Sequence, residues 1–128
     1  MAGSIHLRTH APIAERVLCP GDPGRALRLA QALMTETPRM LNHNRGLWGY
    51  TGPAPDGELL TIQSTGMGGP SAAIVLEELI DLGARRIVRI GTCGVLREGF
   101  ELGELVAAER VLGADGTSAA GSRSGSGS

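Results

Sequence analysis

Lysine is absent from this sequence of 128 residues, so all 12 of its basic side chains are arginines. The absence excludes a Walker A lysine, a Schiff-base lysine and a lysine general base from this chain. Arginine is left as the strong side-chain receptor for anions. A GC-rich coding sequence is the simpler explanation for most of this bias.

Aromatic residues are almost as scarce, at 2% of the chain: Trp48, Tyr50 and Phe100. The core is therefore expected to be aliphatic, and a platform that stacks nucleic-acid bases is disfavoured. The net charge of −1 leaves no electrostatic footprint for DNA or RNA. Hydrophobic residues, at 41%, suit one globular domain of modest size.

Cysteine is limited to Cys19 and Cys93, which have neither metal-binding nor redox spacing. A reduced cytosolic chain is the simplest interpretation. No apolar run has the length of a signal-peptide core or of a membrane span. We therefore expect a cytoplasmic protein without a metal site, a membrane partner or a nucleic-acid partner.

A first strand–turn–helix unit follows the irregular first 15 residues. The apolar run 16–19 is typical of a strand, and the Gly/Pro-rich segment 20–25 is typical of a turn. Asp22 suits the N-cap of a helix and Pro23 its first position. This helix is expected to end at about Met34.

A second strand–turn–helix unit organises the rest of the chain. Residues 58–65 predict a strand, and three glycines before Pro70 allow a sharp turn that approaches a ligand closely. Pro70 suits the first position of the following helix. The apolar residues between 74 and 82 predict a helix that packs on a sheet, and Gly83 is a suitable end.

The remaining segments complete an alternating pattern. Residues 39–52 predict two short strands around 44–46, and 86–90 predict another strand. Residues 102–112 suit a strand or a short helix, and the strand is preferred. Strands alternating with helices predict an α/β fold with a largely parallel central sheet.

The composition changes abruptly near the end of the chain. Residues 119–128 are Gly/Ser-rich and have no apolar side chain larger than alanine. We interpret residues 1–118 as the folded part and 119–128 as a flexible tail or linker. An engineered linker or a shifted reading frame is preferred over a natural disordered terminus.

Three features predict binding of an anion. Gly21 and Asp22 lie at a helix N-terminus, and Arg25 lies one turn further on. Arg89 ends a strand just before a Gly-Thr-Cys-Gly loop, where ligands bind in open α/β sheets. Arg45 lies in a glycine-flanked turn, exposed enough to reach a ligand or a neighbouring chain.

Each feature has a simpler explanation. Arg25 and Arg45 taken alone are typical of solvated surface side chains. Arg89 lies within an apolar strand, where a charge needs a partner, and a structural salt bridge with Glu77 or Glu78 is equally compatible with the spacing.

The ordered combination of motifs is more specific than any one of them. Pro20-Gly-Asp-Pro-Gly-Arg25, Arg45-Gly-Leu-Trp-Gly-Tyr-Thr-Gly52, the run from Ser64 to Leu79, and Arg89-Ile-Gly-Thr-Cys-Gly94 resemble the N-terminal half of the hexameric nucleoside phosphorylases. The resemblance covers about residues 4–118. The 45–52 segment resembles the bacterial purine enzymes, whereas 64–70 and 89–92 also resemble uridine phosphorylase. Purine specificity is preferred.

The resemblance implies a three-layer nucleoside-phosphorylase-like α/β fold, truncated after the N-terminal half, and a dimer-based homo-oligomer. It implies phosphorolysis of purine nucleosides, with inorganic phosphate as co-substrate and no metal or organic cofactor. It assigns phosphate binding to Gly21, Arg25, Arg89 and Thr92, with Arg45 acting on the neighbouring subunit. It assigns nucleoside binding to Met67, Thr92, Cys93 and Gly94, with His6 acting on the neighbouring subunit.

The resemblance also implies what this chain does not contain. In the family, the base-stacking aromatic residue, the residues that bind the ribose hydroxyls and the general acid lie in the second half. No residue here matches them, so no catalytic residue is assigned and the isolated chain is expected to be inactive. The alternatives are a non-catalytic phosphate-binding half-domain, a self-association module or a dinucleotide-binding module. The last fits poorly, because the G-x-G-x-x-G spacing is missing.

Overall fold

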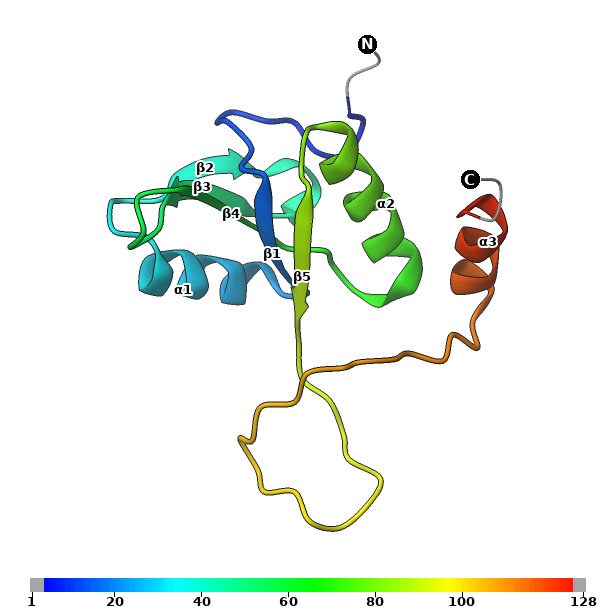
Figure 1. Cartoon of the computed structure of the whole chain (residues 1–128). Coiled ribbons are helices and arrows are strands. Elements are labelled where there is room, and N and C mark those ends of the chain that lie inside the picture. Colours follow the sequence, from blue (N-terminus) through cyan, green and yellow to red (C-terminus); the bar gives the residue numbers. More distant parts are fainter. Residues whose placement is uncertain (1–3, 126–128) are drawn as a thin grey trace. The chain divides into compact units, whose positions relative to one another are not determined.

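The structure is a computed structural model that describes the backbone of residues 4–125 and the side chains of residues 4–121 (Figure 1). The chain divides into two units, Met1–Gly91 and Thr92–Ser128. Among the described residues, the first unit contains a sheet, two α-helices and a short 3-10 helix, η1 (Asn44–Gly46), and the second contains one α-helix. Within the described part of the chain, no helix is long and apolar enough to cross a membrane.

The first unit is built on a five-stranded mixed sheet with the order β2-β3-β4-β1-β5. The strands are β1 (Arg16–Pro20), β2 (Arg39–Asn42), β3 (Gly49–Pro53), β4 (Leu59–Gln63) and β5 (Arg86–Ile90). Strand β1 lies between β4 and β5 and pairs with both in parallel. Strand β3 is antiparallel to β2 and β4. The predicted α/β class is therefore confirmed. The central sheet, expected to be largely parallel, is mixed and has two parallel and two antiparallel ladders.

Helix α1 (Pro23–Leu33) begins as the sequence predicts. The Asp22 side chain accepts a hydrogen bond from the backbone N–H of Arg25 at 2.8 Å and so caps the helix. Ala26 and Ala30 are buried against strands β3 and β4, in a cluster with Met34, Tyr50, Leu60 and Ile62. The small alanine side chains let the helix lie close to the sheet.

Helix α2 (Gly68–Asp81) begins two residues before the predicted position. Gly68 has a φ of +83°, which glycine adopts freely, so the chain enters the helix before Pro70. Pro70 is tolerated because N–H groups in a first helical turn have no partner within the helix. The C-terminal end agrees with the prediction: Gly83 N–H donates to Ile80 O and Ala84 N–H to Leu79 O, which together form a Schellman motif.

Alternate residues of β1 face the two helices. Leu18 packs with the α1 cluster, whereas Val17 and Cys19 pack with Val75 and Leu79 of α2. The two helices therefore cover opposite faces of the sheet, and the first unit has three layers. Layers of this kind leave the ends of the parallel strands accessible to ligands.

The second unit differs from the sequence-based expectation. Residues 92–115 form neither helix nor strand, so the strand preferred for 102–112 is wrong. Leu102, Leu105 and Leu112 are almost fully exposed, and no strand of the described residues pairs with this segment. The local sequence is insufficient here because a strand also needs a partner for its backbone groups.

Helix α3 (Gly116–Gly125) lies where a flexible tail from residue 119 was expected. Asp115 Oδ2 accepts a hydrogen bond from Ser118 N–H at 3.1 Å, which provides an N-terminal cap. The segment 119–125 is therefore helical in the structure, while residues 126–128 lie outside the described residues. The interpretation of this segment as a linker stays a prediction.

Candidate anion-binding site

A cavity of about 610 Å³ lies at the carboxyl ends of the parallel strands. Gly21 follows β1, Gly66 follows β4, and Arg89 lies near the end of β5. This is the edge at which open α/β sheets bind ligands. The cavity is lined by Gly21, Asp22, Pro23, Arg45, Gly46, Leu47, Gly66, Met67, Gly68 and Arg89.

Arg89 reaches the cavity from the edge strand β5. It lies beside Cys19 in the parallel register, and its Nη1 donates a hydrogen bond to the carbonyl oxygen of Ile90. A Cβ atom on Gly21 would lie 3.4 Å from Arg89 Nη2, and one on Gly91 would lie 2.5 Å from Nη1. The two glycines therefore leave the space that the guanidinium group occupies.

The salt bridge considered for Arg89 does not form. Among the described residues, the ion pairs are His6–Glu78, Arg16–Asp56 and Arg85–Glu15. Glu78 is already engaged by His6, at 2.6 Å between Nδ1 and Oε2. The charge of Arg89 is thus left for the cavity, which favours the ligand-binding interpretation over the structural one.

Arg45 lines the cavity from the turn between β2 and β3. Its φ is +59° and that of Gly46 is +67°, and Leu47 N–H donates to Asn44 O at 3.1 Å. Two consecutive positive φ angles are typical of glycine and asparagine, so an arginine here is unusual. The resemblance implies that Arg45 serves a neighbouring subunit, which stays a prediction; in the structure it lines the cavity of its own chain.

The turn after β4 forms another wall of the cavity. Ser71 Oγ donates to Thr65 O at 2.5 Å and lies where a Cβ on Gly66 would fall, so only glycine fits there without a rearrangement. Gly66 N–H donates to Gly21 O at 3.0 Å and joins this turn to the end of β1. Met67 lines the cavity and is 94% exposed, so its side chain is available to a ligand.

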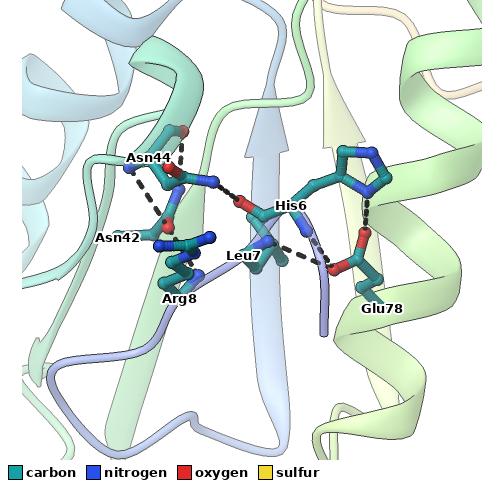
Figure 2. A network of polar contacts seen from close by, with 6 residues as sticks. All are labelled: His6, Leu7, Arg8, Asn42, Asn44 and Glu78. Carbon is teal, nitrogen blue, oxygen red and sulfur yellow. Dashed lines mark hydrogen bonds and ion pairs between the residues drawn. The ribbon is translucent and has the colours of Figure 1, made fainter. Parts of the chain in front are cut away.

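The structure does not bring every predicted residue to this cavity. Arg25 is not among the lining residues, although its backbone N–H holds Asp22 in place. His6 lies instead against Glu78 of α2, as Figure 2 shows. Thr92, Cys93 and Gly94 belong to the second unit and are exposed there.

Sequence reasoning missed the polar residues that support the Arg45 turn. Asn42 and Asn44 precede Arg45 in the chain and hydrogen-bond to the N-terminal arm, residues 4–10 (Figure 2). Two asparagines just before an Arg-Gly pair could have indicated a turn with local side-chain hydrogen bonds. Their long-range partners have no signal in the sequence.

Cys19, which lies beside Arg89 on the neighbouring strand, is unsuited to nucleophilic chemistry. It is fully buried, and burial raises the pKa of its thiol to about 12, although the nearby positive charge of Arg89 opposes this rise. The thiol therefore stays protonated at neutral pH and acts as a small packing group. Within the described residues, no three His, Cys, Asp or Glu side chains are grouped so as to hold a metal ion.

A second cavity of about 610 Å³ lies at the opposite, amino ends of the parallel strands. Its charged residues are largely paired: Arg16 makes two 2.6 Å hydrogen bonds with Asp56, whose pKa this contact lowers. The carboxyl-end cavity differs because Arg45 and Arg89, which line it, form no ion pair with a carboxylate among the described residues. That cavity is therefore the better candidate for an anion.

An α/β sheet with glycine-rich turns and two arginines at a cavity beside its carboxyl edge is an arrangement that suits a small anion. The sequence profile of the phosphorylase superfamily matches residues 15–125, and the chain belongs to this superfamily.

Curated relatives agree with this assignment. The chain is 37% identical to the DeoD-type purine nucleoside phosphorylase of Oceanobacillus iheyensis, 40% to that of Alkaliphilus metalliredigens and 42% to that of Clostridium perfringens. These alignments cover 82–83% of this chain and 45% of each relative. The chain thus spans about half the length of the curated relatives it matches.

Proposed function

We propose that this chain carries the phosphate site and part of the ribose site of a purine nucleoside phosphorylase. The observation that carries the proposal is that Arg45 and Arg89 line one cavity beside glycine-rich turns. The names of the relatives favour a purine over a uridine substrate. A homo-oligomer in which His6 and Arg45 act on a neighbour, as the resemblance implies, is an alternative to the placement of Arg45 at the cavity of its own chain.

The arrangement suits the reaction that the superfamily assignment suggests. Phosphate attacks C1′ of the nucleoside while the glycosidic bond breaks through an oxocarbenium-like transition state, as in other glycosyl transfers. Fixed arginines hold the phosphate anion in line and stabilise the ion pair that develops with the ribosyl cation. Met67, at the mouth of the cavity, supplies apolar contact for the ribose.

The leaving purine also requires a proton, and the cavity offers no suitable acid. Among the described residues that line it, Asp22 is the one carboxylate, and it is occupied as the cap of α1. This supports the expectation that the isolated chain binds phosphate but does not turn over nucleosides. A non-catalytic phosphate-binding half-domain is therefore the second candidate function.

Phosphate titration tests the proposed site. Arg89→Ala and Arg45→Asn should each weaken phosphate binding about tenfold or more, because each removes a charge-assisted contact. Arg28→Ala removes the same charge from an exposed position of α1 outside the cavity and serves as the matched control. Equal phosphate affinity in all three variants and the wild type would reject the site.

Catalysis is tested separately by incubating the chain with inosine and phosphate and following hypoxanthine release. Robust turnover would overturn the expectation of inactivity. Absence of turnover together with Arg89-dependent phosphate binding would support the half-domain. Size-exclusion measurement of the molecular mass tests the oligomer, because a monomer removes both roles assigned to a neighbouring subunit.

A further inference from the structure

The turn that carries Arg45 is held on its β2 side by the buried amide of Asn42. Asn42 is fully buried at the end of β2, and both of its side-chain polar atoms are doubly engaged. Its Oδ1 accepts from Arg8 N–H at 2.8 Å and from Asn44 N–H at 3.3 Å. Its Nδ2 donates to Leu47 O at 2.6 Å and to Asn44 O at 3.3 Å. The amide therefore spans the turn from one side to the other.

The N-terminal arm adds further hydrogen bonds to this network (Figure 2). Asn44 Nδ2 donates to His6 O at 2.9 Å. The backbone N–H groups of His6 and Leu7 donate to Glu78 Oε1 at 2.9 and 3.1 Å. The arm is thus held between the Arg45 turn and helix α2.

The conformation of the turn explains why it needs this support. Arg45 has a φ of +59°, a region that side chains other than those of asparagine and aspartate rarely adopt. A residue persists in such a conformation when the surrounding structure over-determines it, and this is common at binding sites. Here the turn is held by the four hydrogen bonds of the Asn42 side chain and by the hydrogen bond from Asn44 to the N-terminal arm.

We propose that Asn42 is a positioning residue, which fixes Arg45 in the left-handed conformation with which this residue lines the cavity. The N-terminal arm contributes through the backbone of His6 and Arg8. The inference rests on the proposed phosphate site, since it explains how that site is assembled. Asn42 itself is not among the residues that line the cavity.

The replacement Asn42→Asp tests the proposal with little change in shape. It keeps an acceptor for Arg8 and Asn44 but places a carboxylate oxygen against the carbonyl of Leu47 in place of a donor. Phosphate affinity should fall about tenfold, approaching the affinity of Arg45→Asn. Thr9→Ala, an exposed change in the same arm, should leave the affinity unchanged.

A double-mutant cycle separates positioning from general destabilisation. Asn42→Asp should have no further effect on phosphate affinity in the Arg45→Asn background and its full effect in the Arg89→Ala background. An effect of the same size in both backgrounds would overturn the proposal. If Asn42→Asp does not fold, Asn44→Ala, which removes only the bond to His6, should show the same dependence on Arg45.

An NMR measurement decides the question without phosphate. The three-bond HN–Hα coupling and the carbon shifts of Arg45 should report the left-handed conformation in the wild type and its loss in Asn42→Asp or Asn44→Ala. Amide shifts of β1 and β4 should stay unchanged. An Arg45 that keeps its conformation in these variants overturns the inference, whereas a wild type that binds no phosphate overturns the proposed function alone.

Discussion

Replacing Gly49 by alanine tests the packing that underlies the Arg45 turn. Strand propensity alone predicts a gain, because glycine within a strand costs about 0.5–1 kcal/mol relative to alanine. The structure predicts the opposite sign. A Cβ on Gly49 would lie 1.9 Å from Gln63 Oε1 and 2.7 Å from its Cδ, and Gln63 is fully buried.

The size of the expected destabilisation follows from the hydrogen bonds that Gln63 would lose on moving. Its Nε2 donates to Leu47 O at 2.8 Å and to Ser64 O at 3.0 Å. Overpacking costs about 1–3 kcal/mol, and each lost hydrogen bond about 1 kcal/mol. We therefore expect Gly49→Ala to lower the free energy of unfolding by about 2–5 kcal/mol.

Urea unfolding followed by the fluorescence of Trp48, the single tryptophan, measures this change. At about 2 kcal/mol per molar urea, the midpoint should fall by roughly 1–2.5 M. Gly52→Ala in the same strand is the control, because its Cβ would meet the flexible end of Met34, with Sδ at 2.8 Å, and should cost less.

A second background isolates the contact between Gly49 and Gln63. In Gln63→Ala the colliding carboxamide is gone, so that Gly49→Ala should become neutral or slightly stabilising. The reasoning is refuted if the substitution costs as much in this background as in the wild type.

Three further predictions concern the capping residue, the arm and the guanidinium group. Asp22→Ala should lower the unfolding free energy by about 1 kcal/mol through loss of the α1 cap, while Asp22→Ser should retain most of it; thermal unfolding measures both. Burial opposes ionisation of Glu78, but hydrogen bonds from Leu7 and His6 outweigh it and hold its pKa below the ordinary value. The ionised Glu78 carboxylate therefore stabilises the fold at a pH above the ordinary pKa of glutamate, and this stabilisation is lost as the pH falls through the lowered pKa of the folded state. Because Glu78→Gln cannot be protonated in this way, the variant should lose less stability than the wild type between about pH 5 and pH 3. Gly91→Ala should displace the guanidinium of Arg89, because its Cβ would lie 2.5 Å from Nη1, and should weaken phosphate binding in calorimetry with little effect on the melting temperature.

The local elements could be predicted from the sequence because their signals are local. Asp22-Pro23 marks the start of α1, Gly83 marks the end of α2, and the short apolar run 86–90 marks β5. Each signal depends on a backbone preference that the residue carries with it. The placement of Gly21 and Arg89 at one cavity followed from the rule that parallel strands share their carboxyl edge.

The parts of the fold and of the candidate site that the sequence does not predict depend on contacts between residues far apart in the chain. Nothing near Asn42 indicates that its amide meets Arg8, and nothing near Glu78 indicates that it receives His6. The left-handed conformation of Arg45 contradicts its own preference and arises from that surrounding network. Residues 102–112 show the converse case, in which a segment that suits a strand or a short helix finds no partner strand among the described residues.

The central place of β1 has a consequence for the synthesis of the chain. This strand leaves the ribosome first among the five, yet its neighbours are β4 and β5, whose residues follow much later. At about 5–20 residues per second, β1 waits several seconds for both partners. During that interval the backbone N–H and C=O groups along both of its edges lack their strand partners. We therefore expect β1 to be the segment that a chaperone should protect first, and the sheet can close only after β5 has emerged.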